Sequence, residues 1–277
     1  MKIGIVGLGL IGGSFAKAFS QSGHDVFAYD IKDNILESAK LNGIISEMLT
    51  RENISDCDLI IIALYPKETI KYIYMHAEFF SDDAIIIDCC GIKRAVCNEV
   101  FKITDKYNFK FIGGHPMAGL ENSGFEYSRA DIFKNSTMVL VPKDLNNILD
   151  LQRVKELLLP VGFGNFIITT AEQHDKIIAM TSQLTHLIAN AYIASPTIIE
   201  KNIFYANSFK DMTRVASLNS QMWTELFIKN HDYLANELDL FIKRLVDYKN
   251  ALKNSDESAL NKLFETGNKY KKELDNI

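Results

Sequence analysis

The chain has 277 residues, of which 47% are hydrophobic and 23% charged, and a net charge of −5. These totals are typical of a globular protein with room for two domains, and the acidic balance excludes the basic footprint of a nucleic-acid-binding protein. No apolar run reaches the roughly 18 residues that span a bilayer, and glycines interrupt the place of a secretion signal. We therefore expect a cytoplasmic protein with no membrane or nucleic-acid partner.

Four cysteines, Cys57, Cys89, Cys90 and Cys97, show none of the spacings of a metal site. Cys89 and Cys90 follow an apolar run that reads as a buried strand. We expect reduced thiols and no bound metal.

In residues 1–168, short apolar runs alternate with segments of helical periodicity. The runs rich in Ile, Leu and Val predict buried strands, and their alternation with helices indicates a parallel sheet covered on both faces. The predicted strands are residues 2–7, 25–30, 58–64, 83–89, 110–116, 137–142 and 164–170. The predicted helices are residues 12–23, 34–43, 67–80 and 151–162.

From about residue 170 onward the apolar positions recur at helical spacing, which predicts an all-α region over residues 169–277. A threonine with Glu172 and Gln173 behind it forms a capping box at its start. The apolar face of the later helices is wider than that of a surface helix in a monomer, so we expect this region to form a homodimer that buries it. This face comprises Met222, Trp223, Leu226, Phe227, Tyr233, Leu234, Leu238, Phe241, Ile242 and Leu245.

The stretch "GLGLIGGS" follows the first strand and opens the first helix. In this setting the glycines suit a tight turn, close approach of the backbone to a pyrophosphate, and close packing of helix on strand. Asp30 ends the next strand, where its carboxylate would bond ribose hydroxyls and repel a 2′-phosphate; nearby Lys32 weakens that exclusion. The less specific alternatives are a structural glycine turn and, for Asp30, a helix cap. We predict a Rossmann-type domain that binds NAD through Gly7, Leu8, Gly9, Leu10, Ile11, Gly12 and Asp30.

The residues that could take part in catalysis or bind a substrate lie later in the chain. His115 stands between glycine and proline at a strand end, where its near-neutral pKa would suit proton transfer, although a structural loop histidine is the alternative. Ser182 and His186 lie four residues apart on one helix face. His174 precedes His186 by 12 residues, about 18 Å along a continuous helix, so the two cannot hold one metal ion; either histidine could equally serve packing. Arg214 could form an ion pair with the neighbouring Asp211 or bind a carboxylate.

Taken in order, "GLGLIGGS", "GGHPMAG", "EQHDKIIAMTSQLTH" and "DMTRVA…MW" resemble the prephenate dehydrogenase (TyrA) family over essentially the whole chain. The resemblance implies NAD-dependent oxidative decarboxylation of prephenate to 4-hydroxyphenylpyruvate and CO2 in tyrosine biosynthesis. It implies that His115 bonds the substrate 4-hydroxyl and takes its proton, and that Arg214 binds a substrate carboxylate. It also places further residues in or at the edge of the substrate pocket: His174, Ser182, His186, Trp223 and Glu121.

The stretch "DCCGIK" departs from this pattern, because Gly91 stands where many relatives carry a serine expected to touch the substrate or His115. Backbone N–H groups of Cys90 or Gly91 are possible replacements, and Lys93 is predicted to be structural. The sequence ends soon after the helical region, so we expect no regulatory ACT domain or fused chorismate mutase, and any tyrosine feedback would act at the substrate pocket.

Three other functions fit parts of the sequence. Arogenate dehydrogenase would share the chemistry and differ in the substrate side chain. A β-hydroxyacid dehydrogenase or pyrroline-carboxylate reductase would share the two-domain plan, but its chemistry would not account for the motif "HPMAG". A non-catalytic NAD-sensing protein would share the cofactor site alone. We predict an α/β Rossmann-type domain over residues 1–168 and a helical substrate and dimerisation domain over residues 169–277.

Overall fold

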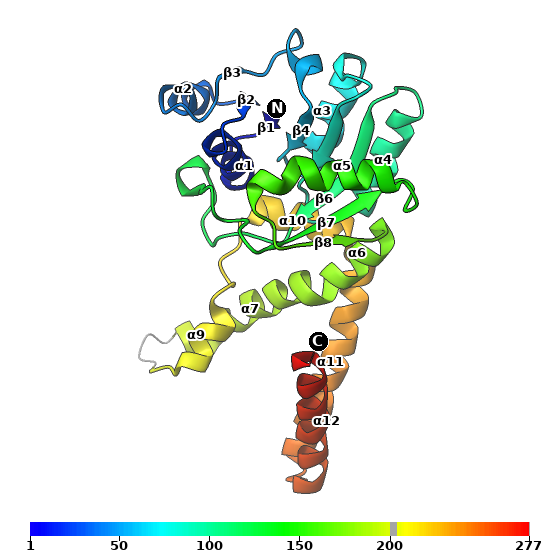
Figure 1. The fold of residues 1–277 in the computed structure, drawn as a ribbon. Coiled ribbons are helices and arrows are strands. Elements are labelled where there is room, and N and C mark those ends of the chain that lie inside the picture. The colour runs from blue at the N-terminus through cyan, green and yellow to red at the C-terminus, as the bar shows by residue number, and fades with distance from the viewer. Residues whose placement is uncertain (200–203, 277) are drawn as a thin grey trace. The chain divides into compact units, whose positions relative to one another are not determined.

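The computed structural model describes residues 1–199 and 204–276 (Figure 1). The chain divides into two compact units, Met1–Asn230 and His231–Ile277. The first unit therefore contains the α/β part together with the first helices of the predicted helical region. The predicted division at residues 168 and 169 follows sequence texture and stays a prediction.

One eight-stranded sheet forms the centre of the first unit, in the order β3-β2-β1-β4-β5-β6-β7-β8. The strands from β3 to β6 are all parallel, whereas β7 is antiparallel to β6 and β8 is parallel to β7. Every predicted strand is present, and the short β3 is an addition. The bounds are β1 (Lys2–Val6), β2 (Asp25–Tyr29), β3 (Glu47–Met48), β4 (Leu59–Ile62), β5 (Ile85–Asp88), β6 (Lys110–Pro116), β7 (Thr137–Pro142) and β8 (Asn165–Ile168).

The antiparallel β7 departs from the predicted parallel sheet, and the connection between β6 and β7 explains it. A parallel strand requires the chain to cross back over the sheet, usually as an α-helix. Residues 117–136 hold only the short 3₁₀ helix η3 (Phe125–Tyr127). Because Pro116 pairs with Met138, β7 begins beside the end of β6. The connection thus stays at the carboxyl edge of the parallel strands.

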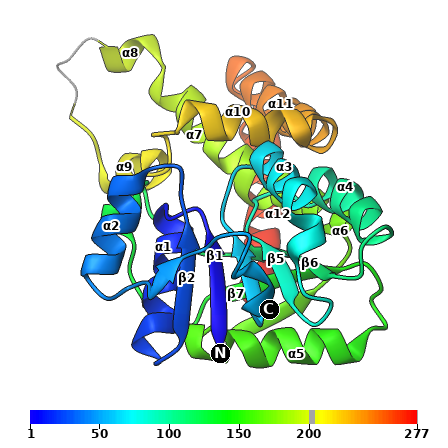
Figure 2. The ribbon, with the colours of Figure 1, turned by 90° about the horizontal axis from the view of Figure 1, so that it is seen from above.

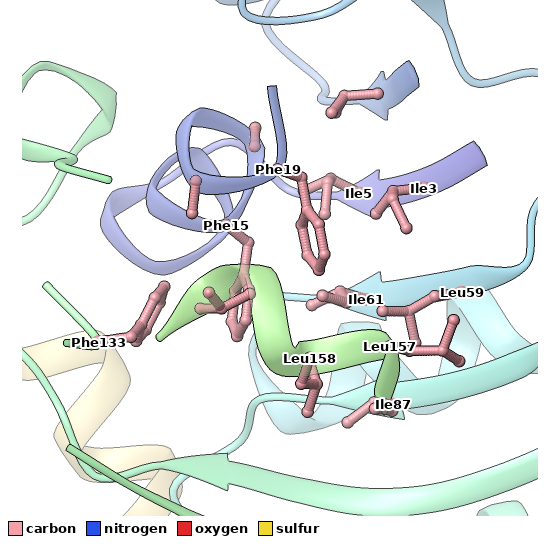
Figure 3. Close-up of a cluster of buried hydrophobic side chains, with 14 of the residues drawn as sticks. Ile3, Ile5, Phe15, Phe19, Leu59, Ile61, Ile87, Phe133, Leu157 and Leu158 are labelled. Carbon is pink, nitrogen blue, oxygen red and sulfur yellow. The ribbon is translucent and has the colours of Figure 1, made fainter. Parts of the chain in front are cut away.

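Helices cover both faces of the sheet, as predicted. On one face α1 (Leu10–Gln21), α2 (Asp33–Leu41) and α5 (Ile148–Leu158) pack on alternate strand residues. In this layer Phe15 stacks on Phe133, with 4.2 Å between ring centroids, and Phe19 lies beside Ile5 of β1 (Figure 3). Burial of such large side chains is worth about 1.5–3 kcal/mol each, so this layer anchors α1 and the turn that precedes it.

On the other face α3 (Pro66–His76) and α4 (Arg94–Thr104) pack side by side (Figure 2). Helix α4 is not among the predicted elements, although its buried residues Val96, Cys97, Val100 and Ile103 recur at helical spacing. Three further 3₁₀ helices are η1 (Ile54–Asp56), η2 (Ala77–Phe79) and η4 (Leu159–Val161). All four cysteines are free thiols, as predicted, and burial raises their pKa values.

The remaining helices of the first unit follow β8, and among the described residues no strand occurs after it. Thr170 caps the first of them, because its hydroxyl accepts the Gln173 N–H at 3.2 Å, which confirms the threonine cap of the predicted capping box. A π-helix, η5, interrupts the run between α6 and α7. The bounds are α6 (Ala171–Ile178), η5 (Ala179–Leu184), α7 (Thr185–Ile193), α8 (Pro196–Ile199), α9 (Asn207–Thr213) and α10 (Ser220–Lys229).

The second unit is a pair of packed helices, α11 (His231–Lys253) and α12 (Glu257–Asp275). Asp256 caps α12 by accepting the Ala259 N–H at 2.9 Å. Large apolar side chains are exposed on both helices, among them Leu240, Ile242, Leu245, Leu252, Phe264 and Leu274. Among the described residues, none of the helices has the length and apolar character needed to span a membrane.

Candidate active site

The glycine turn lies at the carboxyl end of β1, beside the switch point of the sheet between β1 and β4. Gly7 has φ +90°, and a Cβ there would lie 2.7 Å from the Ala63 carbonyl oxygen. A Cβ on Gly12 would lie 1.8 Å from the Gly7 carbonyl oxygen. Only glycine fits at these two positions, so the turn keeps α1 pressed against β1.

The N-terminus of α1 has the features of an anion site. Its N-cap, Gly9, has no side chain to bond the first N–H groups, and no acidic residue lies in the first turn. A Cβ on Gly9 would meet no atom within 4 Å, so the backbone is open to a ligand here. Helix N-termini of this kind bind phosphates through N–H groups and the helix dipole. The side chain of Leu8 is buried in the core and its N–H is bonded to Asp30, whereas Leu10 and Ile11, at the start of α1, are half-buried and would present backbone N–H groups to such a ligand.

Asp30 follows β2 and is bonded to the same turn. Its Oδ2 accepts the Leu8 N–H at 2.7 Å and its Oδ1 accepts the Lys32 N–H at 2.9 Å. The carboxylate also lines a cavity of about 350 Å³ together with Arg51, Tyr72 and other residues. A carboxylate next to a phosphate-binding turn and a cavity fits the adenosine end of a dinucleotide. The residues present therefore suit the predicted cofactor.

His115 lies on β6 one residue before its end, opposite Val139 of β7. Its Nδ1 is 2.9 Å from Nε2 of His174, which comes from α6. Burial lowers the pKa of His115 well below its usual 6.5, and the positive charges near it, on His174 when protonated and on Lys93, lower it further. The imidazole is thus held neutral at the carboxyl edge of the sheet, in the form that accepts a proton.

Behind His115, His174 is almost fully buried and contacts Asp175. Its Nδ1 lies 2.7 Å from Asp175 Oδ1, and burial lowers its pKa despite the opposing effect of that carboxylate. Asp175 also accepts the backbone N–H groups of Lys93 and Arg94, at 2.6 and 2.9 Å. This acid, next to a predicted site residue in "EQHD", is a part of the site that the sequence analysis missed.

A buried ion pair supports the strand that carries His115. Lys93 Nζ donates to Asp88 Oδ2 and to the Gly114 carbonyl, both at 2.5 Å, and both charged side chains are 0% exposed. Burial is the largest single effect on Lys93 and lowers its pKa, but the Asp88 carboxylate and the nearby Cys90 and Cys97 together raise the pKa above its usual value. Asp88 also accepts the Gly114 N–H at 3.0 Å. The ends of β5 and β6 are thereby fixed to each other next to the imidazole.

Gly91, in the turn after β5, adjoins His115. A Cβ on Gly91 would lie 3.9 Å from His115 Nε2 and 3.5 Å from Leu226 Cδ1 of α10. These are ordinary van der Waals distances, so a side chain would fit without strain. The N–H of Cys90 donates to Asp88 Oδ2 at 2.9 Å. Of the two backbone replacements for a serine hydroxyl, the Cys90 N–H is therefore already engaged by Asp88.

Ser182, His186 and Trp223 come from η5, α7 and α10. The Ser182 carbonyl lies 2.9 Å from His186 Nδ1, and because a carbonyl can only accept, this nitrogen carries a proton. The ring of His186 lies against Trp223, with 4.2 Å between centroids. Of the three, Ser182 lies within the π-helix η5, and single π turns of this kind are common at functional sites.

Arg214 follows α9, and its side chain is 66% exposed. Its Nη1 lies 3.9 Å from Oε1 of Glu121, in the connection that follows β6. An exposed pair at this distance contributes little to stability, which leaves the guanidinium able to bind another anion. The neighbouring Asp211, the other candidate partner from the sequence, is exposed as well.

The structure thus joins the predicted residues in three groups: Gly91, His115 and His174; His186 and Trp223, with Ser182 one turn earlier; and Arg214 with Glu121. Among residues 1–199 and 204–276, no cluster of three or more His, Cys, Asp or Glu side chains is arranged to hold a metal ion.

The chain matches two known protein-family models, one after the other along the sequence. Residues 15–166 match the family described as "Prephenate dehydrogenase, nucleotide-binding domain", and residues 170–266 match "Prephenate dehydrogenase, dimerization domain". The chain belongs to the prephenate dehydrogenase family. This confirms the predicted family, and with it the predicted Rossmann-type fold followed by helices.

Relatives of the family share this architecture. The prephenate dehydrogenase of Lactococcus lactis is 29% identical over 99% of this chain and 77% of its own length. The structure of the prephenate dehydrogenase from Aquifex aeolicus in complex with hydroxyphenyl propionate and NAD+ superposes with a TM-score of 0.83, at 26% identity over 98% of both chains. Synechocystis arogenate dehydrogenase also superposes with a TM-score of 0.83, at 23% identity over 99% of this chain and 100% of its own, which shows a common fold alone. The fold therefore does not distinguish the two substrates.

Proposed function

We propose that this protein catalyses the NAD-dependent oxidative decarboxylation of prephenate to 4-hydroxyphenylpyruvate and CO2. The observation that carries the proposal is the state of His115 in a member of this family. The imidazole is neutral, one nitrogen is engaged by His174, and the other lies next to Gly91 at the carboxyl edge of the sheet. That is the geometry of a general base aimed at a ligand beside the cofactor site.

The glycine turn and Asp30 would hold the dinucleotide, the turn by its pyrophosphate and Asp30 by a ribose. When bound, NAD supplies the acceptor for the hydride that leaves C4 of the substrate. Nε2 of His115 takes the proton of the 4-hydroxyl as hydride leaves C4, and the electron pair of the O–H bond forms the C4=O bond, so no positive charge builds up on the oxygen. The bond between the ring and its carboxylate then breaks, CO2 leaves, and the electron pair of that bond makes the ring aromatic while His115 returns the proton to the oxygen. A base of this kind typically contributes 10²–10⁴-fold to the rate.

The substrate is a dianion and requires cationic donors. Arg214 presents a guanidinium with an exposed face, which suits bidentate binding of a carboxylate. The proton on Nδ1 of His186 is committed to Ser182, so this ring meets a ligand through Nε2 or through its face beside Trp223. We assign Arg214, Ser182, His186, Trp223 and Glu121 to the substrate pocket, with Gly91 next to the reacting hydroxyl.

Product analysis tests this function against the other candidates. Prephenate and arogenate are each incubated with the protein and with NAD or NADP, and the products are separated by chromatography. We expect 4-hydroxyphenylpyruvate and NADH from prephenate with NAD. Tyrosine from arogenate as the main product would make the protein an arogenate dehydrogenase. Binding of NAD without turnover of either substrate would support the NAD-sensing alternative.

A homodimer and a cytoplasmic location complete the proposal. Residues 170–266 match a dimerisation domain, and α11 and α12 expose large apolar side chains that a second copy would cover. Four free thiols suit a reducing compartment. Light scattering coupled to gel filtration should give twice the chain mass of 31.3 kDa; a single-chain mass would refute the dimer.

A further inference from the structure

We propose that His174 and Asp175 are positioning residues that hold His115 in one tautomer, with the proton on Nδ1 and a free electron pair on Nε2. The inference rests on the proposed function of His115 as the base. It gives His174 a role different from the predicted contact with substrate, because both of its ring nitrogens already have partners within the protein.

The tautomer follows from the hydrogen bonds, starting at Asp175. Its Oδ1 accepts from the Lys93 amide and its Oδ2 from the Arg94 amide, so this carboxylate acts as an acceptor. The contact at 2.7 Å therefore requires His174 Nδ1 to donate. In a neutral ring the proton on Nδ1 leaves Nε2 as an acceptor. The contact at 2.9 Å then requires His115 Nδ1 to donate, which leaves Nε2 of His115 unprotonated.

The surroundings keep both rings neutral. Among the described residues, the charged side chains that act on the pair are Asp175, from α6, and Lys93 and Asp88, which are bonded to each other. The Arg94 guanidinium in turn lies 3.4 Å from Asp175 Oδ2. Burial is the largest effect and lowers the pKa of both histidines. When Nε2 takes a proton, the new positive charge on His115 is one imidazole away from the Asp175 carboxylate. That arrangement stabilises the protonated base without the need for Asp175 itself to accept the proton.

Because Gly91 replaces the serine expected at this position, the hydrogen bond from His115 to His174 is important in this chain. A side chain at position 91 would start 3.9 Å from Nε2 of His115, and Gly91 has none that could bond this nitrogen. In the part of the chain that the structure describes, His174 is the side chain recorded as hydrogen-bonded to His115. The orientation of the imidazole therefore depends on its Nδ1 side.

A purely structural role is the competing explanation, because Asp175 also ties α6 to the start of α4 and to Asn230. Two substitutions of His174 separate the explanations. His174→Gln keeps an acceptor for His115 Nδ1–H, and His174→Leu removes it. His24→Gln, at a partly buried histidine in the turn between α1 and β2, serves as the matched control.

Steady-state kinetics at equal folded fraction is the first test. We expect His174→Leu to lower kcat by at least about tenfold, with the KM for prephenate and the affinity for NAD within about twofold. His174→Gln should recover most of kcat, and His24→Gln should match the unsubstituted protein. Equal kcat values for the Leu and Gln variants, or a change in KM alone, would overturn the positioning role.

The second test does not need turnover. Nitrogen NMR of the full chain labelled at its six histidines reports which ring nitrogen is protonated, and His115→Asn identifies the His115 signals. At pH 7 we expect a protonated Nδ1 and an unprotonated Nε2, and loss of this preference in His174→Leu. A protonated Nε2 in the unsubstituted protein would overturn the inference. The expected tautomer in a protein that leaves prephenate untouched would refute the proposed function alone.

Discussion

The buried ion pair between Asp88 and Lys93 gives a prediction whose magnitude can be worked from the structure. Lys93→Met keeps a long apolar side chain but removes the charge and the donors. The substitution leaves the Asp88 carboxylate without its counter-charge, in a place where both partners are 0% exposed. It also removes the donor at 2.5 Å from the Gly114 carbonyl, next to His115.

Removing one partner of a buried pair typically costs about 3–5 kcal/mol. Asp88 keeps two backbone donors, the N–H groups of Cys90 and Gly114, which still stabilise its charge. We therefore expect the lower end of that range, about 3 kcal/mol of unfolding free energy. For a folding unit of 150–250 residues this corresponds to a fall in Tm of about 6–12 °C.

Urea unfolding followed by fluorescence, with calorimetry alongside, measures the loss. Lys102→Met is the matched control, because Lys102 pairs with Glu99 at 2.7 Å while both side chains are more than half exposed. This exposed pair should contribute less than about 1 kcal/mol. The double variant with Asp88→Asn should be more stable than Lys93→Met alone. A loss for Lys93→Met no greater than that for Lys102→Met would refute the reasoning.

Four further predictions concern the site. His115→Asn should lower kcat by about 10²–10⁴-fold while NAD affinity, measured by calorimetric titration, stays unchanged; weakened NAD binding would contradict the assignment. Arg214→Ala should raise the KM for substrate by the equivalent of about 2–4 kcal/mol, and an unchanged KM would remove Arg214 from the site. Gly9→Ala should leave Tm unchanged, because its Cβ meets no atom within 4 Å, yet weaken NAD binding by about tenfold or more in the same titration. Folding lowers the pKa values of His115 and His174, so kcat/KM should stay level from pH 8 to 6.5. Below pH 6.5 the unfolded chain binds more protons than the folded one, so the unfolding free energy should fall as the pH drops. An unfolding free energy that does not change between pH 7 and 5 would contradict this prediction.

Local sequence patterns predicted most of the fold. Strands such as residues 2–7 and 58–64 are mainly apolar runs whose ends are marked by glycine or proline. Such strands can be predicted from the local sequence, without information on which segments lie beside them. The helix at Arg94–Thr104 was missed because its apolar residues are spread among polar ones and no glycine marks its end. The direction of β7 was missed because it depends on the path of residues 117–136, and a run of apolar residues carries no sign of direction.

In the candidate site, too, some residues can be predicted from the local sequence and others depend on tertiary packing. The glycine turn and His115 stand out in the sequence because each combines a special residue type with a strand end. The bond between His115 and His174 joins residues 59 positions apart, and tertiary packing alone brings them together. Asp175 was available in "EQHD", but an acid beside a helical histidine is usually a solvated surface residue. Its function depends on full burial, which the sequence pattern does not reveal.

The π-helix between α6 and α7 has a consequence for how this sequence can change. A π turn holds one more residue than an α turn, and each residue of a helix advances the chain by about 100° around the axis. Because the wider turn takes up that residue, loss of one residue between Ala179 and Leu184 would restore a regular helix while α7 keeps nearly the same face toward its neighbours. His186 would stay against the ring of Trp223, whereas the same loss within a regular helix would turn all that follows by about 100°. This short stretch can therefore change in length with less effect on the pocket than the regular helices on either side of it.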